Sequence, residues 1–224
     1  MTALTLVIGN KNYSSWSMRP WVLLRQLGIA FEERLLRFDS DHWDAGIGRW
    51  SPSGLVPVLW RGDVAVWDSL AILETVAEWF PDKPVWPADS VARAFARSTA
   101  AEMHAGFRNL RTSMPMNIRA ALPGKGMSAE VRADVDRIEH LWREARSRFG
   151  SGGDFLFGAF SAADAMFAPV VMRLATYGVA CEPESVRYCE AVKAAPGVRA
   201  WIEGALAETQ FVAVDEPYAQ PPRP

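Results

Sequence analysis

Two serines stand where a helix should begin, in the stretch NYSSWSMRPW from Asn12 to Trp21. Proline is tolerated in the first turn of a helix, where N–H groups lack internal partners, so Pro20 predicts a helix that begins near Trp16 or Ser17. Ser14 and Ser15 would then lie at or just before the N-cap. Either hydroxyl could accept from an orphan N–H, which is worth about 1 kcal/mol. Alternatively, a hydroxyl there could stabilise an anion such as a thiolate, which the helix N-terminus also favours.

Two further pairs of residues could bind a peptide-like ligand. Val56-Pro57 opens a strand, and a cis peptide bond there would turn the N–H and C=O of Val56 outward to pair with an extended peptide. A trans proline at a strand edge is the alternative. Asp68-Ser69 ends a strand and begins a helix, so either residue could be a cap. The same pair could hold a zwitterion, with Ser69 on a carboxylate and Asp68 on an ammonium group.

Other kinds of chemistry find little support in the sequence. No GxSxG motif is present, and no His/Cys/carboxylate cluster has the spacing of metal ligands, so we expect no metal. The formal net charge of −2 and the absence of charge runs argue against nucleic-acid or membrane-surface partners. We find no signal peptide and no apolar run near the roughly 20 residues of a membrane span, which predicts a cytoplasmic protein. Cys181 and Cys189 are expected to be buried thiols.

The elements that must position these residues alternate between strand and helix up to residue 80. A parallel βαβ crossover followed by an antiparallel hairpin is the arrangement that this order favours. The pattern predicts strands at 4–8 and 30–38, helices at 16–27 and 70–80, a short helical segment at 41–50, and a hairpin of 56–60 with 64–67.

Everything after a proline-containing linker at 81–88 has helical periodicity. The sequence therefore predicts an α/β domain at 1–80 and an all-α domain at 89–215, followed by a proline-rich, poorly ordered tail at 216–224. Within the second domain, Ser161 and Asp164 predict a capping box ahead of a helix. Helices are expected at 91–114, 131–149, 184–194 and 198–208, and from residue 162 onward.

These motifs, in this order, resemble the cytosolic glutathione S-transferases, and the resemblance covers nearly the whole chain. YSSWSMRPW is similar to the serine-bearing motif of zeta-like and related bacterial members, and Asp-Ser-x-Ala-Ile-Leu to the family's next helix start. The segments 101–117 and 160–169 are similar to parts of the second domain. The resemblance implies a thioredoxin-like domain joined to an all-helical domain, glutathione and a small electrophile as substrates, and a homodimer.

The resemblance also implies a role for each candidate residue. Ser14 would face the glutathione sulfur, with Ser15 as the close alternative. The remaining glutathione contacts would be Val56 beside cis-Pro57 for the cysteinyl backbone, Asp68 and Ser69 for the γ-glutamyl end, and His42 or Trp43 for the glycyl carboxylate. The second-substrate pocket would be lined by Trp16 and by His104, Phe107 and Arg111 on one helical face, although Phe107 fits a core position equally well.

Conjugation of glutathione to electrophiles is the leading interpretation of these features. Trp16 occupies the position of a cysteine in zeta members, which argues against maleylacetoacetate isomerase activity. Other glutathione-dependent isomerisations and peroxide reduction use the same thiolate and stay open. A non-catalytic regulator and a ligand-binding protein without turnover are alternatives from a different class, although retention of the serines and of Asp68-Ser69 favours the enzyme.

Overall fold

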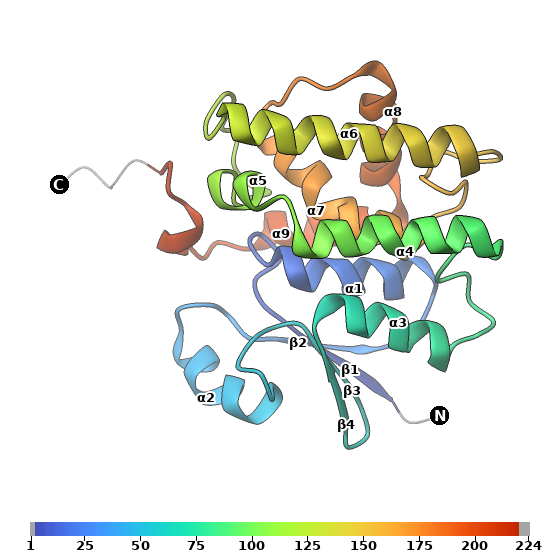
Figure 1. Cartoon of the computed structure of the whole chain (residues 1–224). Helices are drawn as coiled ribbons and strands as arrows, with labels where there is room; N and C mark the ends of the chain where they lie inside the picture. The colour runs from blue at the N-terminus through green and yellow to red at the C-terminus, as the bar shows by residue number, and fades with distance from the viewer. Residues whose placement is uncertain (1–2, 220–224) are drawn as a thin grey trace.

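The computed structural model describes residues 3–219, and its first part is built on a mixed sheet (Figure 1). Strand β1 (Leu4–Ile8) lies parallel to β2 (Glu32–Leu35) and antiparallel to β3 (Val58–Arg61), which pairs with β4 (Val64–Trp67). The strand order is β2-β1-β3-β4. The predicted crossover and hairpin are therefore both confirmed.

Alternating side chains of β1 pack on the two faces of this sheet, as the period of a strand requires. Leu6 and Ile8 join the core formed with α1 (Ser15–Gln26) and α3 (Ser69–Trp79). Val7 packs on the opposite face, against residues of α2 (Asp41–Trp50). Figure 1 shows α2 on the side of the sheet away from α1 and α3.

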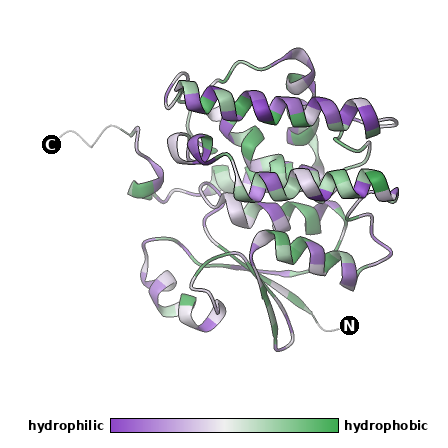
Figure 2. Ribbon diagram, in the orientation of Figure 1, coloured by the Kyte–Doolittle hydropathy of each residue, from purple (hydrophilic) through white to green (hydrophobic). Residues whose placement is uncertain are grey.

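The second part is helical, with α7 at its centre. Almost every residue of α7 is buried, whereas α6 is amphipathic, and Figure 2 shows hydrophilic residues along much of its length. None of the helices within residues 3–219 is long and apolar enough to cross a membrane. The helices are α4 (Ser90–Ala105), α5 (Arg108–Ser113), α6 (Ala129–Phe149), α7 (Ala162–Thr176), α8 (Pro183–Ala194) and α9 (Pro196–Ala207), and the short 3₁₀ helix η1 (Ala213–Asp215) follows them.

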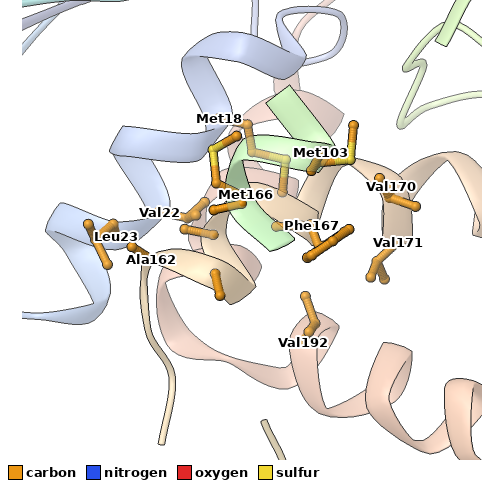
Figure 3. Close-up of a cluster of buried hydrophobic side chains, with 14 of the residues drawn as sticks. Met18, Val22, Leu23, Met103, Ala162, Met166, Phe167, Val170, Val171 and Val192 are labelled. Atoms are coloured by element: carbon orange, nitrogen blue, oxygen red, sulfur yellow. The ribbon is translucent and has the colours of Figure 1, made fainter. Parts of the chain in front are cut away.

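The two parts share one continuous apolar core. Met18 and Val22 of α1 cluster with Met166 of α7 and Met103 of α4, as Figure 3 shows. Helix α1 also packs on α9. The start of α1, which carries the serines, is therefore held firmly against the helical part.

The start of α7 confirms the predicted capping box. Ala163 N donates to Ser161 Oγ (3.3 Å), and Ser161 N donates to Asp164 Oδ2 (2.9 Å). Asp164 also accepts from Leu156 N and from the hydroxyl of Tyr188, both at 3.1 Å. Burial nevertheless raises the pKa of this carboxyl to about 6, because desolvation outweighs the hydrogen bonds to the charged form.

One expectation about the helical part was wrong. The helix expected at 91–114 breaks after Ala105, because Phe107 adopts a left-handed conformation with φ 55° and α5 begins at Arg108. In the predicted tail, Tyr218 donates to the carbonyl of Ser113 (2.7 Å). Residues 220–224 of the predicted tail lie outside the described residues.

Candidate functional site

Two adjoining cavities contain most of the predicted site residues. We call them the serine cavity, of about 410 Å³, and the Asp68 cavity, of about 360 Å³. A larger cavity of about 760 Å³ beside the linker includes none of those residues. Trp16, Leu55, Val56 and Arg111 line both site cavities, so the two meet there. The serine cavity is also lined by Tyr13, Ser14, Ser15, Phe38, Trp43, Pro115, Met116, Arg173 and Asp215, and the Asp68 cavity by Ser53, Pro57, Trp67, Asp68, Ser69 and His104.

The first serine does not cap the helix. Ser14 occupies the N-cap position of α1, but its side chain accepts from no backbone N–H of that helix. Its hydroxyl instead donates to Ser17 Oγ (2.7 Å), which in turn accepts from Gly9 N (3.2 Å). Capping as the role of Ser14 is therefore wrong, and its hydroxyl hydrogen is directed toward Ser17.

The second serine has a different hydrogen-bond environment. Ser15 is the first residue of α1, and its Oγ accepts from Arg173 Nη2 at 3.2 Å. Within residues 3–219 the Ser15 hydroxyl donates to no acceptor, so its hydrogen remains available to an anion in the cavity. A guanidinium behind a hydroxyl oxygen polarises the O–H bond, which makes Ser15 the better placed donor.

Buried positive charge surrounds the junction of the cavities. The guanidinium carbon of Arg19 lies 4.1 Å from the Trp16 ring centroid, and that of Arg111 lies 5.1 Å from it. Arg19 is 1% exposed and donates to the backbone carbonyls of Ser15 and Met166, so it is a buried charge that holds structural elements together. Burial lowers the pKa of Arg19 well below its ordinary value, and the nearby guanidiniums lower it further.

The Asp68 cavity combines a fixed carboxylate with a hydroxyl that has no partner. The Val56–Pro57 peptide bond at its wall is cis. Asp68 Oδ1 accepts from Leu70 N (2.9 Å), which confirms a capping role, and Oδ2 lies 2.7 Å from His104 Nε2. Ser69 is 1% exposed, and its Oγ has no hydrogen-bond partner among the described residues. An unpaired donor beside a helix N-terminus fits a carboxylate ligand.

The remaining predicted residues are divided between site and core. Trp43 lines the serine cavity and makes an edge contact with Phe38, with ring centroids 5.1 Å apart. The side chain of His42 lies outside the described part of the structure. The prediction that Phe107 shares a helical face with His104 and Arg111 was wrong. Phe107 is 7% exposed, belongs to the core and lines neither site cavity, because α4 ends before it.

Sequence reasoning missed several residues of the site, of which Arg173 and Asp215 bring the most charge. One signal was available for Arg173, since a lone arginine in the otherwise apolar run of α7 marks a buried charge. No comparable signal marked Asp215, which reaches the cavity from η1 near the end of the described chain.

Other chemistry-bearing groups lie outside these cavities. Cys181 and Cys189 are half-buried free thiols, and burial raises their pKa values to about 11 and about 12, so both are protonated at neutral pH. Across residues 3–219, no three His, Cys, Asp or Glu side chains are grouped so that they could hold a metal ion.

The chain is similar in sequence to several known proteins. The chain is 37% identical over 82 residues to glutathione S-transferase 1 of Dianthus caryophyllus, a match that spans 36% of this chain and only 37% of that protein. It is also 26% identical over 184 residues to a stringent starvation protein A homologue of Coxiella burnetii. That match spans 82% of this chain and 82% of the relative.

The fold has close structural counterparts. A glutathione transferase homologue from Burkholderia gl BGR1, solved with bound glutathione, superposes with a TM-score of 0.69 at 24% identity, covering 91% of this chain and 98% of that one. This likeness shows that the fold is a thioredoxin-like sheet and helix domain followed by an all-helical domain. Residues 13–79 match the model of the glutathione S-transferase N-terminal domain, and residues 128–204 match that of the C-terminal domain. Because these matches together span more than half of the chain, it belongs to the glutathione S-transferase family.

Proposed function

We propose that the protein conjugates reduced glutathione to small electrophiles through a thiolate that a serine hydroxyl stabilises. The observation that carries the proposal is the junction of the two cavities. Val56, the cis peptide bond at Pro57, Asp68 and Ser69 line one side of it, and Ser14 and Ser15 lie on the other. A tripeptide paired with Val56 and held at Asp68 and Ser69 would reach the serines with its cysteinyl sulfur.

The chemistry that this arrangement supports is nucleophilic attack by sulfur. A thiol of pKa about 8.5 is mostly protonated at neutral pH, and each unit by which the site lowers that pKa corresponds to about 1.4 kcal/mol. The hydroxyl of Ser15, the start of α1 and the nearby guanidiniums all favour the negative charge. The proton passes to solvent, the sulfur forms a bond to the electrophilic carbon, and the leaving group departs with its electron pair.

The hydrogen-bond pattern favours Ser15 over Ser14 as the donor to the thiolate. Ser14 already donates to Ser17, whereas the Ser15 hydroxyl accepts from Arg173 and donates to no acceptor among the described residues. Titrating the ultraviolet absorbance of bound thiolate against pH in the Ser14→Ala and Ser15→Ala variants tests this choice. We expect Ser15→Ala to raise the thiol pKa by about one unit. If neither variant shifts the pKa or lowers turnover, the serine mechanism is wrong.

A screen of electrophiles tests the activity itself. Turnover of glutathione with aryl halides, epoxides, peroxides and maleyl compounds distinguishes conjugation from peroxide reduction and isomerisation. Measurable conjugation of 1-chloro-2,4-dinitrobenzene above the uncatalysed rate supports the proposal. Efficient maleyl isomerisation without conjugation would replace it with the isomerase alternative.

A non-catalytic regulatory role is the second candidate, and one observation favours it. The stringent starvation protein A homologue covers more of this chain than the plant transferase does. Retention of the protein on immobilised glutathione, with elution by free glutathione, favours the enzyme. Failure to bind glutathione, together with capture of another protein through the transferase-like surface, would favour the regulator.

We further propose that the enzyme works as a homodimer in the cytoplasm. The free thiols of Cys181 and Cys189 are compatible with a reducing compartment, in which glutathione is kept as the thiol. Exposed apolar side chains on β4, among them Val64 and Trp67, offer surface to a second copy. Sedimentation equilibrium tests the dimer directly, and a monomer at micromolar concentration would contradict it.

A further inference from the structure

Three guanidinium groups lie close to the serine cavity, and those of Arg111 and Arg173 line it. Arg19 and Arg111 lie over the Trp16 ring, and Arg173 reaches Ser15. Across residues 3–219, none of these arginines has a carboxylate oxygen within 4.0 Å. The wall of the serine cavity therefore carries positive charge that no acidic side chain pairs with directly.

Two of the three arginines are committed to the backbone. Arg19 donates to the carbonyls of Ser15 and Met166. Arg111 donates through Nη1 to two carbonyls at the end of α4, at 3.1 and 3.0 Å. These bonds fix both side chains in place and leave Arg111 at the boundary of the cavities.

Arg173 is only partly satisfied. It is 6% exposed and lines the serine cavity, with Nη2 on Ser15 Oγ and Nη1 buried without a hydrogen-bond partner in the described chain. Burial and the charge of Arg111 lower its pKa to about 10, so it remains cationic at neutral pH. Asp215 lines the same cavity, and although burial raises the pKa of its carboxyl to about 6, the charge of Arg173 opposes that rise and the carboxyl is mostly ionised at neutral pH. No hydrogen bond joins Asp215 to Arg173, so the guanidinium nitrogens are not occupied by it.

The rest of the serine cavity is suited to a small carbon skeleton. Apolar side chains of Leu55, Pro115 and Met116 and the rings of Phe38 and Trp43 form its walls. A ligand that fills this cavity would thus contact apolar side chains over most of its surface and the guanidinium groups of Arg111 and Arg173 at one end. Planar guanidinium groups recognise carboxylates better than other side chains do.

We infer that Arg173, together with Arg111, forms an oxyanion site in the serine cavity that accepts the carboxylate of the second substrate. This inference rests on the proposed transferase function and specifies the class of electrophile, a small carboxylate-bearing molecule. Its acidic group lies at Arg173 and its electrophilic carbon beside Ser15, where the thiolate is held.

A matched pair of aryl chlorides tests the site, namely 4-chloro-3-nitrobenzoate and its neutral amide. In both, sulfur forms a bond to the ring carbon, the carbon–chlorine bond breaks, chloride leaves and the thiol proton passes to solvent. Each kcat/KM is divided by the rate constant of the uncatalysed reaction with glutathione, which removes intrinsic reactivity. We expect the ratio of acid to amide to be roughly tenfold or more in the wild type, as one charge-assisted contact provides.

Three variants assign the preference to the arginine. Arg173→Met should reduce the ratio to about one, and Arg173→Lys should retain part of it because the charge persists. Both substitutions should also lower turnover of the amide, because Arg173 contacts Ser15. The readout is therefore the ratio of acid to amide and not the turnover of either substrate. Arg199→Met is the matched control, because Arg199 is exposed on α9, away from both cavities, and pairs with Glu203 of the same helix. It should leave the ratio unchanged.

Binding of unreactive 4-methyl-3-nitrobenzoate by calorimetry, without glutathione, keeps the test independent of turnover and of variant folding. We expect the wild type to bind the acid more tightly than its amide, with affinity that falls as salt is added. Equal handling of acid and amide, in turnover or binding, overturns the oxyanion site while leaving the transferase proposal intact. Selective binding of the acid by a protein that does not bind glutathione supports the oxyanion site and shows that the transferase proposal is wrong.

Discussion

Replacing Ser69 by alanine should make the protein more stable without glutathione and bind glutathione less tightly. Ser69 Oγ is buried without a partner among residues 3–219. A buried hydroxyl without a hydrogen-bond partner destabilises the folded protein by about 1–3 kcal/mol. Replacement by alanine removes this destabilisation, but the small cavity that it leaves offsets part of the gain. We expect a net gain of about 1 kcal/mol, which for a chain of this size raises Tm by roughly 2–4 °C.

The effect on ligand binding has the opposite sign. If Ser69 donates to the γ-glutamyl carboxylate, its loss removes a charge-assisted hydrogen bond of about 1.5–3 kcal/mol, which weakens binding roughly 10- to 150-fold. Glutathione at about 100 times the wild-type Kd stabilises the wild type by about 2.7 kcal/mol. A variant with hundredfold weaker binding would gain only about 0.4 kcal/mol at the same concentration.

Thermal denaturation with and without glutathione measures both effects in one experiment. Ser98→Ala is the matched control, because Ser98 is exposed on α4 and its hydroxyl donates to the carbonyl of Ala94 in its own helix. It should leave both the Tm and the glutathione-induced shift unchanged within about 1 °C. A Ser69→Ala protein that is less stable than the wild type and shows the full glutathione shift would refute the assignment of Ser69 to the ligand.

Further outcomes concern the thiolate, the γ-glutamyl end and stability against pH. Ser15→Ala should lower kcat/KM for conjugation roughly tenfold or more in steady-state assays, and Ser14→Ala should lower it less, because Ser14 donates to Ser17 whereas the Ser15 hydrogen has no acceptor within the part of the chain that the structure describes. Asp68→Asn should raise KM for glutathione about tenfold with little change in Tm, since its pair with His104 is exposed; an unchanged KM would argue against Asp68 as a ligand. Asp164 has a folded pKa of about 6, above its unfolded value, so its protonated form is favoured in the folded state and its contribution to stability falls as pH rises from about 4 to 6. Urea denaturation should therefore show the wild type gaining roughly 2 kcal/mol relative to Asp164→Asn between pH 7 and pH 4, and parallel pH profiles would contradict this.

The elements were predictable because local signals agreed with the tertiary structure. The strand at 4–8 and the helix at 41–50 have the predicted bounds, and the Ser161–Asp164 capping box forms as its spacing indicates. In each case the pattern that selects the element also selects the face that packs on the core.

The break between α4 and α5 could not be predicted in the same way. Apolar residues continue at helical spacing through 103–114, yet Phe107 turns into the left-handed region and its ring enters the core. Arg111 then donates to carbonyls exposed at the end of α4, including that of Gly106. The periodicity of apolar residues predicts which helix face is buried, but it does not predict where the chain changes direction. The boundary between α4 and α5 therefore depends on tertiary packing.

The candidate site was predictable in its ligand-facing half only. Ser15 begins α1, Val56 lies just before β3, and Asp68 lies between β4 and α3. Sequence signals are strong at such boundaries, and all three residues line the cavities. The hydrogen bond from Arg173 to Ser15 joins residues 158 positions apart. No local pattern connects them, because their contact depends on how α7 packs against α1.

The charge at Arg173 is better explained by the chemistry of the site than by the stability of the fold. Its neighbours on α7 are buried and mostly apolar, so a methionine would fit the pattern of the helix. Burying a guanidinium with one nitrogen unpaired opposes folding, and replacing such a charge by an apolar side chain is often neutral or stabilising. Buried groups that weaken a fold tend to occur where a protein binds or transforms a ligand. The same reasoning applies to the unpaired hydroxyl of Ser69, and the two residues lie in the walls of adjoining cavities, one on each side of the junction where the sulfur is expected.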